Sequence, residues 1–169
     1  MVVIGLGSNQ GQSREIVPRA MQALEIFAQP GSFQRSRLWQ TSPVDCPADS
    51  DLFVNAAVCF EALAEVTPEG LLADLKALER DFGRGAKIVR NAPRELDLDL
   101  LIFNGERRDT QYFTLPHPRA VERLFVLAPV AEIVPGLRWP GMSTTVRELL
   151  DGLETDEQVT PLDNTASST

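Results

Sequence analysis

The sequence predicts a sandwich in which α-helices pack on a β-sheet, and two observations carry that prediction. Apolar runs typical of strands alternate along the chain with segments whose apolar residues recur at helical spacing, and tight turns separate them. No internal repeat or change of composition divides the 169 residues, a length ordinary for one domain with one core. The order of the strands in the sheet does not follow from this pattern.

Four extended segments are predicted. Residues 2–6 form a short buried strand that ends in a Gly-Ser-Asn turn, and residues 32–41 are extended. Residues 53–61 form a long strand, and residues 96–103 form another strong one. Because the last four residues of 96–103 are apolar on both faces, we expect this segment to be a central strand.

Four helices are predicted between and after the strands. The first has its apolar stripe over residues 16–27, and Pro18 must lie in its first turn or kink it. Thr67 is the expected N-cap of the second, because proline follows it at the first helical position. The third covers residues 121–134, and the last follows a capping box that begins at Thr145.

The chain is predicted to be a single domain over residues 1–153, followed by a disordered polar and acidic tail over residues 154–169. No apolar run reaches the roughly 20 residues of a membrane span, and the first residues lack the basic flank of a signal peptide. We therefore expect a cytoplasmic protein that binds no membrane. A monomer is also expected, although no feature of the sequence determines the oligomeric state. The net charge of −8 also argues against a nucleic-acid binder, which needs a basic face.

The charge is unevenly distributed along the chain. Residues 80–94 contain five basic side chains and one acid, a net +4, which leaves −12 on the remaining residues. This compact basic segment favours a small polyanion as ligand, and a solvated helix end followed by a loop fits the pattern equally well. Most of the basic residues are arginine, whose planar fork pairs with phosphate.

The most informative residues are Asp97 and Asp99, on the last predicted strand. Alternate side chains of a strand share a face, so both carboxylates point one way and Leu96, Leu98 and Leu100 the other. Two adjacent carboxylates repel unless a cation lies between them, and Mg²⁺ is held by one or two carboxylates with waters and substrate phosphates. The pair therefore favours a Mg²⁺ site for a nucleotide over the alternative, a solvated acidic face on an edge strand.

A nucleotide bound here would have to be held without a glycine cradle. The opening Gly5-Leu6-Gly7-Ser8-Asn9 lacks the glycine-lysine-hydroxyl ending of a P-loop, and no kinase catalytic loop is present. The phosphates would then be held by metal and by arginines, of which Arg84, Arg90 and Arg94 precede the two acids. Phosphoryl transfer needs mainly positioning and charge neutralisation, so a general base is optional.

Other residues carry weaker signals. His117 is the only histidine, and its flanking prolines indicate a fixed turn, so a structural role is the more common one. Taken singly, Phe53, Asn55 and Phe125 also fit structural roles on a strand, at a strand end and in a helical core.

Together these segments resemble the 6-hydroxymethyl-7,8-dihydropterin pyrophosphokinase family from Val2 to about Leu150. The run Arg90-Asn91-Ala92-Pro93-Arg94-Glu95-Leu96-Asp97-Leu98-Asp99-Leu100-Leu101 looks like the family signature at every defined position. The supporting segments are the opening Gly-Ser-Asn, Thr41-Ser42-Pro43-Val44, Phe53-Val54-Asn55-Ala56-Ala57, Glu79 with Gly83-Arg84, and Pro116-His117 with Arg123 and Phe125.

The resemblance implies an α+β fold, a ferredoxin-like sandwich with helices packed on an antiparallel sheet. It also implies an enzyme of tetrahydrofolate biosynthesis that transfers pyrophosphate from ATP to 6-hydroxymethyl-7,8-dihydropterin and releases AMP. Two Mg²⁺ ions would bind to Asp97 and Asp99, and Arg84 and Arg94 complete the implied catalytic set. The implied ATP contacts are Arg84 on a mobile loop, Arg90, Arg94, His117 and Arg123. The implied pterin contacts are Phe53 and Phe125, which would stack on the ring, and Asn55, Thr41 and Val44, which would read its amide edge.

Three positions depart from some members of that family: Phe53 replaces tyrosine, Asn91 replaces tryptophan and Tyr112 replaces arginine. Two other functions fit the sequence. One is a different Mg²⁺-dependent phosphoryl-transfer enzyme or phosphatase, which would use the same acids without needing the aromatic pair. The other is a duplicated family member kept as a nucleotide- or pterin-binding module. The presence of both acids, Arg84 and His117 argues against this second alternative.

Overall fold

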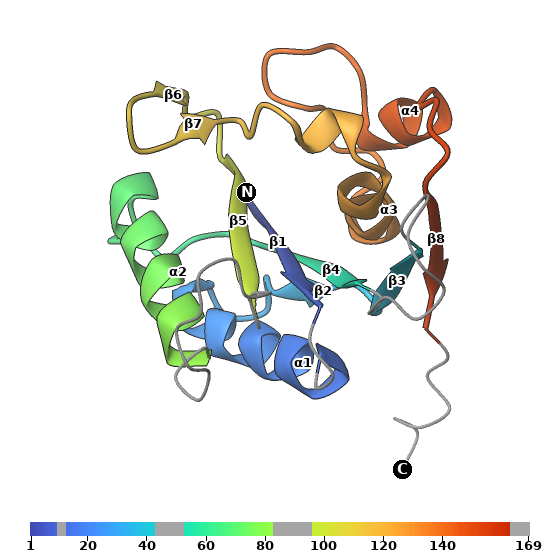
Figure 1. Ribbon diagram of the computed structural model, residues 1–169. Helices are drawn as coiled ribbons and strands as arrows, with labels where there is room; N and C mark the ends of the chain where they lie inside the picture. The colour runs from blue at the N-terminus through green and yellow to red at the C-terminus, as the bar shows by residue number, and fades with distance from the viewer. Residues whose placement is uncertain (10–12, 43–52, 83–95, 163–169) are drawn as a thin grey trace.

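The computed structural model describes residues 1–9, 13–42, 53–82 and 96–162 (Figure 1). Its strands are β1 (Val2–Ser8), β2 (Gln34–Arg35), β3 (Trp39–Ser42), β4 (Phe53–Phe60), β5 (Asp97–Phe103), β6 (Arg108–Asp109), β7 (Thr114–Leu115) and β8 (Gln158–Pro161). Its helices are α1 (Ser13–Leu24), α2 (Pro68–Phe82), α3 (Leu124–Ile133) and α4 (Val146–Asp151), with short 3₁₀ turns η1 (Glu25–Phe27) and η2 (Ala120–Glu122). Each predicted strand and helix is therefore present, with shifted bounds.

The main sheet is antiparallel, with strands in the order β5-β1-β4-β3-β8 and β2 also paired to β4. Along the chain, β1, α1, β3, β4, α2 and β5 form a strand-helix-strand-strand-helix-strand unit whose first strand lies between the last two. This is the ferredoxin-like arrangement, so the expected α+β fold is confirmed.

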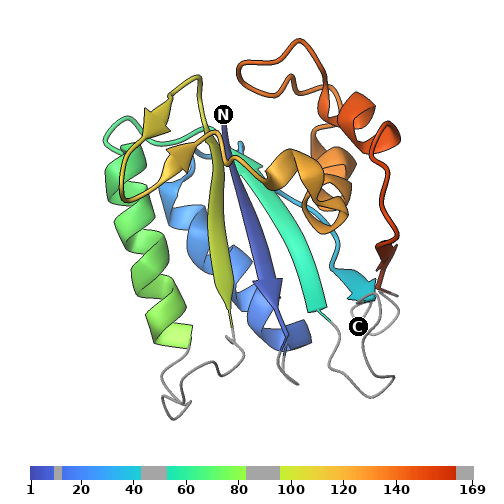
Figure 2. The same cartoon turned by 45° about the horizontal axis from the view of Figure 1, so that its top comes forward.

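Two cores lie on opposite faces of the sheet. On one face, α1 and α2 bury apolar side chains against residues such as Ile4, Leu98 and Leu100 (Figure 2). On the other, α3 and α4 pack over Val3, Leu101 and their neighbours. These two helices cover only part of the second face, so side chains at the other end of the same strands remain accessible.

The expectation that the 96–103 segment is a central strand is wrong. Among the described residues, β5 lies at the end of the strand order and pairs only with β1. It is apolar on both faces because α2 covers one face and the second core covers the other. Its outer edge is also partly bonded: Leu98 N–H donates to Glu79 Oε2 at 2.7 Å, and His117 N–H donates to the Leu101 carbonyl at 2.9 Å.

The helix ends follow the predicted capping chemistry. Gly70 N–H donates to Thr67 Oγ1 at 3.0 Å, and Thr145 and Glu148 form a reciprocal capping box. Pro18 is the sixth residue of α1 rather than lying in its first turn, so the chain tolerates it in the second turn. The third helix begins at Leu124 because the preceding residues form η2.

The predicted disordered tail is wrong for residues 158–161. They form β8, which pairs with β3 so that Thr41 lies opposite Val159. Composition misled the prediction, because strand pairing through the backbone needs no apolar side chain and an edge strand tolerates proline. The rest of the proposed tail beyond residue 162 lies outside the described residues, and no described helix has the length and apolarity to cross a membrane.

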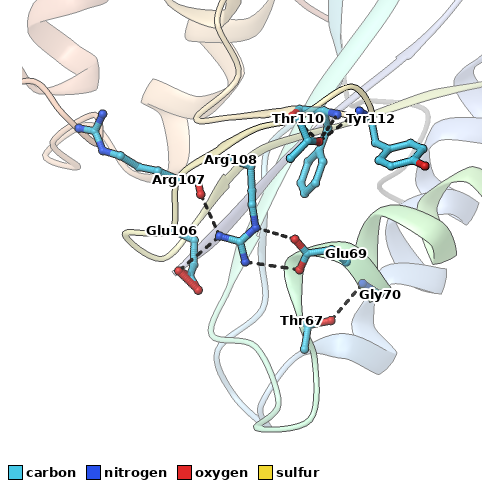
Figure 3. Close-up of polar contacts among 9 residues, drawn as sticks. Thr67, Glu69, Gly70, Glu106, Arg107, Arg108, Thr110 and Tyr112 are labelled. Atoms are coloured by element: carbon cyan, nitrogen blue, oxygen red, sulfur yellow. Dashed lines mark hydrogen bonds and ion pairs between the residues drawn. The ribbon is translucent and has the colours of Figure 1, made fainter.

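The small β6–β7 hairpin is fastened to the start of α2 by one arginine (Figure 3). Arg108 Nε donates to Glu69 Oε2 at 2.5 Å, and Arg108 Nη1 lies 3.7 Å from Glu106 Oε2. This ion pair lowers the pKa of Glu69, chiefly through the hydrogen bond from Arg108. The hairpin leads directly into the segment that contains His117.

Candidate active site

A cavity of about 610 Å³ opens on the part of the sheet that α3 and α4 leave uncovered. Its floor follows the strand register, since Asp97 lies opposite Gly7 and Gly7 lies opposite Asn55. Residues directly opposite each other in neighbouring strands share a face, so these three positions form one row across the sheet. The volume is typical of a pocket for a small-molecule ligand.

Two glycines of β1 keep this floor open. Gly5 and Gly7 lie on the face of β1 that lines the cavity, between the acids of β5 and the side chains of β4. A Cβ placed on Gly7 would lie 3.1 Å from Asn55 Nδ2, a closer approach than side chains normally make. The glycines therefore leave space between the carboxylates and the Asn55 amide. A side chain at position 7 would crowd the position that Asn55 Nδ2 occupies.

Asp97 and Asp99 both line the cavity, on the face predicted for them. Asp97 is half-buried and Asp99 is exposed, whereas Leu98 between them is buried in the opposite core. The bond from Leu98 N–H to Glu79 fixes the strand at the residue between the two acids. Since Glu79 comes from α2, the helix holds the outer edge of the strand between the two acids, while β1 pairs with its inner edge.

The donor set at this end fits Mg²⁺. Within the described part of the chain, no group of three or more His, Cys, Asp or Glu side chains could enclose a metal ion. Two carboxylates beside an open glycine-lined floor instead leave coordination positions for water and phosphate oxygens, which is how proteins usually hold this ion.

Asn55 and Thr41 form a buried polar pair at the other end of the row. Each is 6% exposed, and Thr41 Oγ1 donates to Asn55 Oδ1 at 2.7 Å. This hydrogen bond orients the Asn55 amide so that its oxygen faces Thr41 and its Nδ2 faces Gly7 and the cavity. The pair presents a fixed N–H donor to a ligand.

Two aromatic side chains line the cavity from different elements. Phe53, on β4, is 42% exposed, an unusual exposure for a phenylalanine, and Phe125, on α3, is half-buried. The Arg123 guanidinium carbon lies 5.6 Å from the centre of the Phe125 ring and also lines the cavity. The flat rings and this cation thus border the same space as the two acids.

His117 lies near Asp99, outside the cavity lining. Its backbone bond to Leu101 holds it at the outer edge of β5, where it is close enough to Asp99 and Arg123 for their charges to act on its ring. Burial lowers the pKa of His117, Asp99 opposes that shift, and Arg123 and Arg119 reinforce it. Arg119 N–H donates to His117 Nδ1 at 3.3 Å, which requires the proton of the neutral ring to be on Nε2.

Most of the residues proposed from the sequence meet at this cavity. Those that line it are Thr41, Phe53, Asn55, Asp97, Asp99, Arg123 and Phe125. Those that lie outside the described residues are Val44, Arg84, Arg90 and Arg94. Tyr112 is 78% exposed on the hairpin.

Sequence reasoning missed two contributions to the lining. The alternation of Gly5 and Gly7 on a strand was a usable signal, because two glycines on one face remove the side chains that would fill it. Glu157 also lines the cavity, from a segment whose composition resembles a solvated tail. No local pattern distinguishes Glu157 from its acidic neighbours.

Comparison with known proteins gives a consistent set of matches. Residues 3–135 match the family described as 7,8-dihydro-6-hydroxymethylpterin-pyrophosphokinase. The chain is 40% identical over 130 residues to the 2-amino-4-hydroxy-6-hydroxymethyldihydropteridine pyrophosphokinase of Bacillus subtilis, covering 77% of this chain and 75% of that protein. It is 39% identical over 153 residues to the protein of the same name from Methylorubrum extorquens, covering 89% and 92%.

A crystal structure of a Plasmodium falciparum HPPK-DHPS triple mutant with pteroate has a similar fold. Its TM-score is 0.66 at 15% sequence identity, over 89% of this chain. The chain spans 42% of that longer protein. At this identity the likeness concerns the fold alone.

Proposed function

The chain belongs to the 7,8-dihydro-6-hydroxymethylpterin-pyrophosphokinase family, and we propose that it transfers pyrophosphate from ATP to 6-hydroxymethyl-7,8-dihydropterin in folate biosynthesis. In this reaction the hydroxymethyl oxygen attacks the β-phosphorus of ATP. The bond from that phosphorus to the oxygen bridging to the α-phosphate breaks, AMP leaves with the oxygen, and the hydroxyl proton passes to solvent. The products are AMP and the pterin diphosphate.

The observation that carries the proposal is the joining of two different kinds of site in one cavity. The β5 end offers two carboxylates, and the β4 and β3 end offers an aromatic ring and a fixed amide. Three strand steps of about 4.8 Å separate β5 from β3, roughly 14 Å in all, which accommodates a heterocycle and a phosphate chain end to end. A phosphatase would not require the second end.

At the carboxylate end, Asp97 and Asp99 would hold two Mg²⁺ ions together with the ATP phosphates. When bound, the ions supply positive charge that offsets the charge developing on the phosphate oxygens. The chain's own part is to hold the two carboxylates on one face with space beside them, which the bond from Leu98 to Glu79 and the Gly5 and Gly7 floor provide.

Cationic and donor groups complete the phosphate end. Arg123 lines the cavity, and neutral His117 has Nε2–H as its donor. Arg84, Arg90 and Arg94 are assigned from the family resemblance and lie outside the described residues. Their task is to neutralise the transferring group, with Arg84 engaging late, in the transition state.

At the other end, the pterin ring would lie between Phe53 and Phe125. A flat heterocycle gains from two aromatic faces, and the exposure of Phe53 leaves its ring available for such a contact. Asn55 Nδ2, oriented by Thr41, would donate to a ring acceptor such as the 4-oxo oxygen. Val44 would contribute a backbone contact beside Thr41.

The reaction is tested by incubating the protein with ATP, Mg²⁺ and 6-hydroxymethyl-7,8-dihydropterin and separating the products by chromatography. We expect one AMP for each pterin diphosphate. Release of ADP or free phosphate would point to a different phosphoryl-transfer enzyme, and absence of turnover with intact binding would point to a binding module. Omitting Mg²⁺ should abolish turnover. We also propose that the protein is a cytoplasmic monomer, and size-exclusion chromatography with light scattering should then give the mass of one chain.

A further inference from the structure

We propose that Glu157 is a specificity residue for the pterin, because it lines the cavity from the segment just before β8 and its carboxylate can accept hydrogen bonds from the ring's 2-amino and N3–H groups. This inference rests on the proposed function and adds a contact from the C-terminal segment. The segment lies beyond residues 3–135, which match the family.

The register of the adjoining strand indicates the cavity side of the sheet for Glu157. Val159 of β8 lies opposite Thr41 of β3, whose side chain lines the cavity. Glu157 is two residues before Val159, so the period of an extended chain gives it the same face as Val159 and Thr41. The lining of the cavity includes Glu157 accordingly.

A local turn supports this orientation. Glu157 N–H donates to Thr155 Oγ1 at 3.1 Å, which fixes the chain just before β8 begins. Glu157 is half-buried, whereas its neighbours Asp156 and Gln158 are exposed. The segment thus turns one acid toward the cavity and leaves the adjacent acid in solvent.

The chemistry of the pterin edge matches a carboxylate. An ionised carboxylate only accepts hydrogen bonds, and N3–H and the 2-amino group of a 2-amino-4-oxo pyrimidine are adjacent donors that can pair with its two oxygens. Asn55 Nδ2 supplies a donor on the same floor, so the two side chains together offer acceptors and a donor to one ring. An acceptor pair of this kind would distinguish a pterin from a ring with a 2-oxo group.

The position of Glu157 favours the pterin over ATP as its ligand. It directly precedes β8, which pairs with β3 at one end of the strand order, whereas Asp97 and Asp99 lie on β5 at the other end. A carboxylate placed among phosphates would repel them, and a carboxylate remote from them does not. We therefore expect Glu157 to leave nucleotide affinity unchanged.

The test compares Glu157→Gln with Asp156→Asn, which removes a neighbouring exposed carboxylate. Binding of 6-hydroxymethylpterin and of its 2-oxo analogue is measured by calorimetry with Mg²⁺ and a non-hydrolysable ATP analogue present. We expect Glu157→Gln to weaken pterin binding about tenfold or more, the scale of a hydrogen bond to a charged group, and to narrow the preference for pterin over the 2-oxo analogue. Asp156→Asn should change neither.

Unchanged preference between the two rings in Glu157→Gln would overturn the proposal, as would a loss confined to nucleotide binding. Equal losses in Glu157→Gln and Asp156→Asn would also overturn it, because they would indicate a general charge effect. Failure of the proposed function has a different signature, since the unaltered protein would then either not bind the pterin or bind it without forming AMP. Melting temperatures of both variants show whether β8 still folds.

Discussion

Replacing Thr41 with valine should weaken pterin binding without changing any atom that the proposed site uses for ATP. The change keeps the shape of the side chain and removes the hydroxyl that donates to Asn55 Oδ1 at 2.7 Å. Both residues are 6% exposed, so the amide oxygen would lose its partner in a place that water reaches poorly. Asn55 would then be free to rotate and present its oxygen instead of Nδ2 to the ligand.

The structure sets the expected size of the effect. Leaving a buried acceptor unpaired costs about 1–3 kcal/mol of folding stability, and a misdirected amide costs a comparable amount in pterin binding, so the KM for pterin should rise about tenfold. Urea denaturation measures the first quantity and steady-state kinetics the second. Thr41→Ser is the matched control, because it keeps the hydroxyl and should retain most of the folding stability and most of the pterin affinity.

A double-mutant cycle with Asn55→Ala makes this test decisive. If Thr41 acts through the amide, Thr41→Val should add little to the loss of pterin affinity in Asn55→Ala. Fully additive losses, or a rise in the KM for ATP of the same size as that for pterin, would refute the positioning role. So would a Thr41→Ser variant as weak as Thr41→Val.

The remaining predictions concern the phosphate end. Asp97→Asn and Asp99→Asn should each lower kcat by roughly 10³-fold or more, the scale of losing a transition-state electrostatic contact, with melting temperatures unchanged. Arg84→Ala should lower kcat while calorimetry shows unchanged ATP affinity; lost nucleotide binding would contradict its late role. Burial lowers the pKa of His117 in the folded protein below its ordinary value of 6.5. As the pH falls below 6.5, the imidazole is therefore protonated in the unfolded chain before it is protonated in the folded protein. The buried neutral ring therefore contributes to folding stability above pH 6.5, and this contribution is lost as the pH falls below that value. The urea midpoints at pH 7.5 and 5.5 should consequently differ less in His117→Gln than in the unaltered protein.

Local patterns predicted much of the fold and the carboxylate end of the site. The period of two along residues 96–101 was enough to place Asp97 and Asp99 on one face, because side-chain direction in a strand depends only on the alternation. Thr67 and Thr145 marked helix starts for the same reason, since a cap acts within one turn. These features involve neighbours in the sequence.

Features that depend on distant parts of the chain could not be predicted in this way. The place of β5 at the end of the strand order follows from pairing between remote segments, and its two apolar faces fit a central strand equally well. β8 is polar enough to resemble a solvated tail, and only its pairing with β3 brings Glu157 to the cavity. The link between Thr41 and Asn55 likewise depends on the register of β3 against β4.

The most direct measurement is a crystal structure with Mn²⁺ in place of Mg²⁺, a non-hydrolysable ATP analogue and the pterin, in which anomalous scattering locates the metal. The carboxylates of both Asp97 and Asp99 should lie within bonding distance of an anomalous peak that also contacts phosphate oxygens, with the pterin at the Phe53 end. A bound triphosphate with no anomalous peak at those carboxylates would contradict the proposed site.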